Sequence, residues 1–134
     1  MTKILVFGTF DGLHEGHVNF FMQALEHGDY LSVVVGRDST VFKTKKKFPK
    51  HKEIERLKAV QDCKLVNEAR LGNEGNDPYK IIKEINPDII CLGYDQTHFV
   101  DRLEKKIEDM GLKIKIQRLK SYKPEQFKSS LLNK

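Results

Sequence analysis

The sequence predicts an α/β protein with three layers, in which helices cover both faces of a mostly parallel five-stranded sheet. Short apolar runs rich in β-branched residues alternate with segments of helical spacing along the chain, which is typical of parallel strands joined by helical crossovers. No linker, internal repeat or low-complexity segment interrupts this order. We therefore expect residues 1–134 to form one domain with a Rossmann-like arrangement, a length that suits domains of about 100–150 residues.

Five runs have the length and composition of strands. Residues 30–35 are continuously apolar, as expected of a parallel strand that is buried on both faces. In the last run, Ile114 and Ile116 alternate with polar residues, which suits the edge of a sheet. The predicted strands are residues 3–7, 30–35, 64–66, 89–92 and 113–117.

Four segments have the spacing of helices. The first carries His17, Phe20, Phe21 and Ala24 directly after the first strand. The others are expected at residues 52–61, with Ile54, Leu57 and Val60 as its apolar stripe, at 78–85 and at 100–110. Gly111 closes the last of them.

The positive charge is concentrated in one segment. The net charge is +5, and residues 43–52 hold six of the 24 basic residues without any acidic one. Without those six the balance is 18 basic against 19 acidic residues, or −1. The sequence therefore predicts one basic loop, for which a polyphosphate is as good a partner as a nucleic acid.

Composition also bounds the cellular setting. No apolar run approaches the roughly 20 residues of a membrane span, and the chain begins with a strand pattern instead of a signal peptide. We expect a cytoplasmic protein with no membrane partner. Cys63 and Cys91 lack metal-ligand spacing and are interpreted as reduced structural thiols.

One stretch, residues 7–17, joins the first strand to the first helix. Gly8 and Gly12 allow backbone conformations that other residues resist, and Gly16 allows close approach at the start of the helix. His14 and His17 fall on one face of the first helical turn. Because a helix N-terminus offers N–H groups that have no intrahelical partner, two imidazoles beside it predict a phosphate site.

These residues carry a resemblance to a known family. Gly8-Thr9-Phe10-Asp11 followed by His14-x-Gly16-His17 resembles the GTFDxxHxGH signature of cytidylyltransferase-like nucleotidyltransferases, enzymes that join a nucleoside triphosphate to a phosphorylated acceptor. The resemblance implies catalytic roles for His14 and His17, and a place near the acceptor or a metal for Asp11. It implies nucleotide contacts for Gly8, Thr9, Phe10, His14, Glu15, Gly16 and His17.

Two later segments extend the resemblance. Gly93 and Asp95 resemble the family's Gly-x-Asp after the fourth strand, which implies binding of the ribose or the base. Lys128, Ser129 and Ser130 resemble its terminal phosphate-binding segment. In the basic loop, Lys46 aligns best with the family's catalytic lysine, and Lys43 and Lys45 are neighbours able to replace it.

The tail decides between two branches of the family. Arg118 stands eleven positions before Ser129, whereas the cytidylyltransferase pattern has an arginine close to the Ser/Thr pair. Residues 93–97 and the tail are more similar to archaeal-type FAD synthases, which are FMN adenylyltransferases, and Tyr122 would stack on the adenine. We therefore expect ATP and FMN as substrates, with Mg²⁺ on the triphosphate and a homodimer, as the resemblance implies. The alternative is a CTP:glycerol-3-phosphate cytidylyltransferase.

Two other classes of function remain open. The basic loop with Phe42 and Phe48 as stacking partners suits a nucleic-acid-binding module, although that interpretation leaves both histidines unexplained. We therefore expect no nucleic-acid partner. A nucleotide-binding regulator without turnover is the other alternative, and the intact His14, His17 and Lys46 argue against it.

Overall fold

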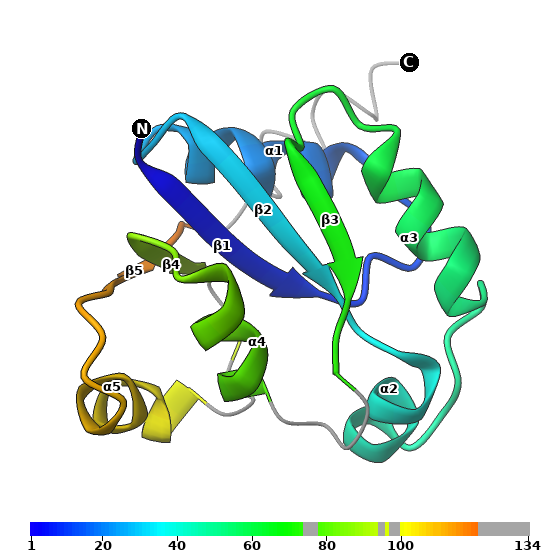
Figure 1. The fold of residues 1–134 in the computed structure, drawn as a ribbon. Coiled ribbons are helices and arrows are strands. Elements are labelled where there is room, and N and C mark those ends of the chain that lie inside the picture. The colour runs from blue at the N-terminus through cyan, green and yellow to red at the C-terminus, as the bar shows by residue number, and fades with distance from the viewer. Residues whose placement is uncertain (74–77, 94–95, 97–99, 121–134) are drawn as a thin grey trace.

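A computed structural model describes residues 1–73, 78–93, 96 and 100–120 (Figure 1). Its strands form one sheet in the order β3-β2-β1-β4-β5, and every neighbouring pair is parallel. The strands are β1 (Lys3–Gly8), β2 (Tyr30–Val35), β3 (Glu68–Leu71), β4 (Ile89–Leu92) and β5 (Lys115–Arg118). This arrangement confirms the predicted α/β, Rossmann-like fold class.

Helices cover both faces of this sheet. The helices are α1 (Glu15–Leu25), α2 (Asp38–Lys45), α3 (Glu53–Gln61), α4 (Pro78–Ile85) and α5 (Val100–Asp109). Phe21 of α1 and Val60 of α3 belong to the core cluster on one face. Ile82 of α4 and Leu103 of α5 belong to the cluster on the other. The predicted three layers are therefore present.

The central strand β1 shows why both faces must be covered. Ile4 and Val6 are fully buried on the α1 and α3 side, whereas Leu5, between them, is fully buried on the α4 and α5 side. Successive side chains of a strand point to opposite faces, so a continuous apolar run requires a layer of helices on each side. Cys91 of β4 is also buried, and this burial raises the pKa of its thiol to about 11.

The third strand lies later than predicted. Residues 64–66 were expected as a strand, but Val66 donates to the carbonyl of Cys63 in a turn that follows α3. Asn67 then joins β2, because its side chain accepts from Leu31 N–H at 2.8 Å, and the ladder begins with Ser32 opposite Glu68. Leu65 and Val66 are apolar because they pack against the core below the turn.

The basic segment is partly helical, which the sequence did not predict. Helix α2 ends at Lys45, so only the lysines after it belong to an irregular segment. Asp38 in the first turn and two lysines in the last complement the helix dipole, which favours a helix despite the high charge. Lys46 ends this helix with a left-handed backbone (φ 62°).

The predicted edge position of the last strand is confirmed. Strand β5 begins at Lys115, two residues later than predicted.

The order in which the strands are added to the sheet reverses at β1. Strands β2 and β3 extend the sheet on one side of β1, and β4 and β5 extend it on the other. Ligands of open parallel sheets bind beyond the carboxyl ends of the strands at such a switch point. The segment after β4 is tied to this place, because Arg118 donates to the carbonyls of Gly93 at 2.7 Å and Gln96 at 2.6 Å.

Replacing Gly8 with alanine tests how tightly this edge is packed. A Cβ on Gly8 would lie 2.6 Å from the ring of Phe10, which is 4% exposed and packs on Phe21. We expect Gly8→Ala to lower the free energy of unfolding by about 1–3 kcal/mol, measured by urea denaturation. Gly72→Ala is the control, since its Cβ would meet its nearest neighbour at an ordinary 3.7 Å. Equal effects of the two substitutions would contradict this packing argument.

Candidate active site

The turn after β1 brings an aromatic side chain under the first helix. Phe10 has a left-handed backbone (φ 53°), which is uncommon for a residue that is not glycine, and Gly12 has φ 82°. The Phe10 ring meets the ring of His17 edge-on at 5.3 Å. This buried ring positions His17, so a nucleotide contact of Phe10, as the resemblance implies, would have to come from its backbone.

His14 and His17 form a reciprocal cap at the start of α1. Nδ1 of His14 accepts from the backbone N–H of Gly16 at 3.0 Å, and the backbone N–H of His14 donates to Nδ1 of His17 at 3.3 Å. The rings stack with their centroids 3.9 Å apart. An imidazole nitrogen that accepts carries no proton, so each neutral ring holds its proton on Nε2. Both histidines thus present an Nε2–H donor beside a helix N-terminus.

The electrostatics of the pair favour the neutral donor form of His17. Burial first, then the positive charges of a protonated His14 and of Lys45, lower the pKa of His17 to about 4. At neutral pH this ring is uncharged and its Nδ1 stays available as an acceptor. Gly16 must be small here, since a Cβ on it would lie 2.8 Å from the His14 ring.

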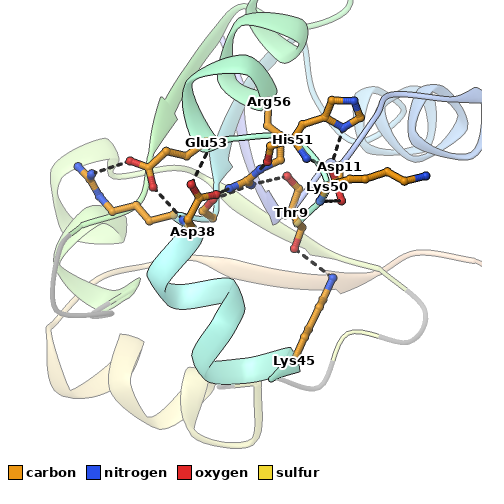
Figure 2. A network of polar contacts seen from close by, with 10 residues as sticks. Thr9, Asp11, Asp38, Lys45, Lys50, His51, Glu53 and Arg56 are labelled. Atoms are coloured by element: carbon orange, nitrogen blue, oxygen red, sulfur yellow. Dashed lines mark hydrogen bonds and ion pairs between the residues drawn. The ribbon is translucent and has the colours of Figure 1, made fainter. Parts of the chain in front are cut away.

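Among the described lysines, Lys45 reaches the turn after β1. Its Nζ donates to the Thr9 hydroxyl at 3.2 Å (Figure 2). The charge of Lys45 also contributes to the lowered pKa of His17. Lys46, the residue favoured by alignment, is exposed at the end of α2. The role of Lys46 stays a prediction, and the geometry adds Lys45 as a candidate cation. Glu15 is exposed as the first residue of α1.

Asp11 holds the segment that follows the basic helix. Its carboxylate accepts from the backbone N–H groups of Lys50 at 2.7 Å and His51 at 2.9 Å, and it contacts Nδ1 of His51 at 2.8 Å (Figure 2). Burial alone would raise the pKa of Asp11, but these hydrogen bonds and the charge of a protonated His51 hold it at about 2. The geometry gives Asp11 a positioning role, while its expected place near the acceptor or a metal stays a prediction.

Sequence reasoning missed a buried arginine in α3. Arg56 is 1% exposed and donates to the carbonyls of Thr9 at 2.8 Å, Gly36 at 2.7 Å and His51 at 3.0 Å. Its remaining contact is an ion pair with Asp38 at 2.7 Å (Figure 2). The predicted apolar stripe of this helix is wrong at Ile54, which is 64% exposed. The sequence held one signal for this burial: Arg56 lies four residues before the buried Val60, and residues at this spacing share one face of a helix.

The donors of this site suit phosphate better than a metal. In the described part of the chain, no cluster of three or more His, Cys, Asp or Glu side chains could hold a metal ion. The carboxylate of Asp11 is already engaged by three N–H groups. These residues do not fit a Mg²⁺ site on the protein, so Mg²⁺ stays a prediction, as an ion carried by the triphosphate.

Several predicted site residues lie outside the described residues. These are Asp95, Tyr122, Lys128, Ser129 and Ser130. Gly93 is described, and its N–H donates to the Gln96 side chain at 3.1 Å. Over the residues that the structure places, no helix is both long and apolar enough to cross a membrane.

A parallel sheet that carries two imidazoles at a helix N-terminus beside its switch point defines a nucleotide-phosphate-binding α/β protein. The chain belongs to the cytidylyltransferase-like family, which matches residues 5–133. The resemblance in the GTFDxxHxGH stretch is thereby confirmed.

Similar proteins indicate which branch of the family this chain resembles most. An FAD synthase of Methanobrevibacter smithii is 45% identical over 133 residues, covering 97% of this chain and 86% of that protein. An FAD synthase of Methanosarcina mazei is 46% identical over 119 residues, 89% and 77% of the two chains. A crystal structure from Thermoplasma volcanium, described as a lipopolysaccharide core biosynthesis protein, superposes with a TM-score of 0.84 at 40% identity, covering 91% of this chain and 98% of that one.

Removing the buried guanidinium tests its structural weight. Arg56→Met leaves Asp38 and three carbonyls without their partner, so we expect the free energy of unfolding to fall by about 3–5 kcal/mol. Arg70→Met is the matched control, because Arg70 pairs with Glu84 at 2.8 Å at the surface and should lose less than about 1 kcal/mol. Urea denaturation of both variants measures the difference, and comparable losses would refute the role of Arg56.

The lowered pKa of His17 predicts a pH dependence of stability. Because the pKa of His17 is about 4 in the folded state, against 6.5 for an unperturbed histidine, the unfolded chain binds more protons between these values. The contribution of His17 is thus fully present above pH 6.5 and is lost as the pH falls towards 4. His17→Asn keeps an acceptor that does not titrate, so from pH 7 to 4.5 it should lose less stability than the wild type in urea denaturation. A parallel decline would contradict the shift.

Proposed function

We propose that the protein is an FAD synthase, an enzyme that transfers AMP from ATP to FMN with release of pyrophosphate. The observation that carries this proposal is the reciprocal cap of His14 and His17, which fixes two Nε2–H donors at the N-terminus of α1. The names of the similar proteins, FAD synthases at 40–46% identity, supply the substrates. The proposal makes the protein a nucleotidyltransferase, and adenylyl transfer is favoured over cytidylyl transfer.

The reaction exchanges one phosphorus–oxygen bond for another. A phosphate oxygen of FMN attacks the α-phosphorus of ATP, the bond from that phosphorus to the bridging oxygen breaks, and pyrophosphate leaves with the electron pair. No covalent intermediate with the protein is needed, since positioning and charge stabilisation supply most of the rate in such transfers.

The two histidines stabilise the charge that develops. His14 and His17 donate Nε2–H bonds to oxygens of the α-phosphate and to the bridging oxygen that leaves. The rings stack on each other, Phe10 packs against His17, and backbone N–H groups hold both Nδ1 atoms, so the donors are oriented before the substrate arrives. Lys46, which the alignment favours, neutralises the leaving pyrophosphate, and Lys45 beside Thr9 is the candidate cation for the attacking phosphate.

The remaining contacts belong to the proposal as well. The backbone of Gly8, Thr9 and Gly16 lies beside the phosphates of the nucleotide. Gly93 and Asp95 bind the ribose or the base. Tyr122 contacts the adenine, while Lys128, Ser129 and Ser130 bind phosphate. Mg²⁺ would add charge neutralisation on the triphosphate, and a cytoplasmic homodimer completes the proposed setting.

The competing functions have weaker support. A CTP:glycerol-3-phosphate cytidylyltransferase would share the histidine chemistry, but the similar proteins reported above as enzymes are FAD synthases. A nucleic-acid-binding module would leave the two Nε2–H groups at the start of α1 without a catalytic role. Two lysine positions also have other contacts, since Lys45 donates to Thr9 and the Lys50 backbone to Asp11.

A turnover assay with defined substrate pairs tests the proposal. Purified protein with Mg²⁺ should form FAD and pyrophosphate from ATP and FMN faster than it forms CDP-glycerol from CTP and glycerol 3-phosphate, as resolved by chromatography. The base is discriminated because a wrong one leaves buried polar groups unpaired. Formation of CDP-glycerol alone would overturn the proposed acceptor and base. Absence of turnover with both pairs would overturn the proposal that the protein is this enzyme.

A histidine variant in the same assay tests the mechanism. His17→Ala should lower kcat by about 10²–10³ with a small change in the ATP KM, because the lost donor acts mainly in the transition state. His27→Ala is the control histidine, since His27 follows the opposite end of α1. Unchanged kcat with a raised KM in His17→Ala would show that the residue binds and does not catalyse.

A further inference from the structure

Two aromatic rings lie exposed in α2 and in the segment that follows it. Phe42 of α2 and Phe48 of the irregular segment after it stack with centroids 4.6 Å apart and planes 24° apart. Phe42 is 44% exposed and Phe48 is 64% exposed. Although Phe42 stacks on the Phe48 ring, the exposed fraction leaves much of the Phe48 side chain accessible to a ligand. Large exposed aromatic surface of this kind often marks a binding site.

The aromatic pair is linked to the reacting phosphates through α2. Lys45 lies three residues after Phe42, so both leave neighbouring positions on one side of the helix. Figure 2 shows Lys45 reaching from the end of α2 to Thr9, in the turn after β1. The pair therefore lies one helical turn from a cation that contacts this turn.

The pair and the segment after β4 belong to opposite halves of the sheet. Helix α2 follows β2, on one side of β1, while Gly93 follows β4, on the other. The function proposed above assigns the base of ATP to the segment after β4. Two bulky groups that meet at one phosphate chain need separate places, and this topology provides one on each side.

We propose that the Phe42–Phe48 pair binds the isoalloxazine ring of the acceptor flavin, an inference that rests on the function proposed above. A flat, extended aromatic ring gains most from stacking on an exposed aromatic face. The exposed ammonium groups of Lys43, Lys46 and Lys47 give the surroundings the charge that an anionic flavin phosphate requires. The flexible ribityl chain joins the ring to the phosphate at Lys45 and Thr9.

Fluorescence quenching of FMN by the intact protein tests this inference separately from turnover. Phe48→Leu keeps an apolar side chain but removes the flat face, so its FMN affinity should fall about tenfold. Phe48→Trp keeps the flat face and should bind FMN within about twofold of the wild type. Met22→Ala, which removes another exposed apolar side chain from α1, is the control and should leave FMN binding unchanged.

Steady-state kinetics then decide which substrate the pair contacts. We expect Phe48→Leu to raise the FMN KM and leave the ATP KM unchanged. A raised ATP KM with an unchanged FMN KM would assign the rings to the adenine and overturn the inference. Wild-type FMN affinity in Phe48→Leu, or no FMN binding by the wild type, would also overturn it. Failure of the proposed function is distinct, since it is the absence of FAD formation by the wild type.

Discussion

The buried guanidinium of Arg56 is the contact on which the rest of the site depends. It joins the turn after β1, the end of β2 and the start of α3, because its donors are shared among carbonyls of all three segments. Its charge is balanced by Asp38, whose own backbone N–H is held by Glu53 at 2.8 Å. A buried charge is tolerated only when it is paired and fully hydrogen-bonded, and within the described residues no buried side-chain N or O lacks a partner.

A second contact, through Asp11, repeats this connection at the surface. Asp11 binds the backbone at residues 50 and 51, and Arg56 binds the carbonyl of His51, so the two ends of one short segment are fastened to the same turn. The exposed lysines that follow α2 therefore lead into a segment that is held in place at residues 50 and 51.

How much the sequence could predict depends on how local each interaction is. The histidine cap spans only a few residues, and glycine positions with apolar strand runs have local signatures, so the fold class and the place of both histidines at the start of α1 were predictable. Arg56 was not, because its partners lie up to 47 residues away and only the assembled fold brings them together. The strand predicted at residues 64–66 was wrong for a related reason. Leu65 and Val66 are apolar because they pack against the core cluster, and not because they pair in the sheet.

The double use of His14 and His17 has an evolutionary consequence. Both side chains accept backbone N–H groups at the first turn of α1, so selection for a folded chain alone favours acceptors at these positions, whatever happens to catalysis. A descendant that lost turnover would still be destabilised by losing either side chain. The motif can therefore persist after the activity is lost. In a relative, the presence of both histidines is better evidence for a correctly capped helix than for catalysis.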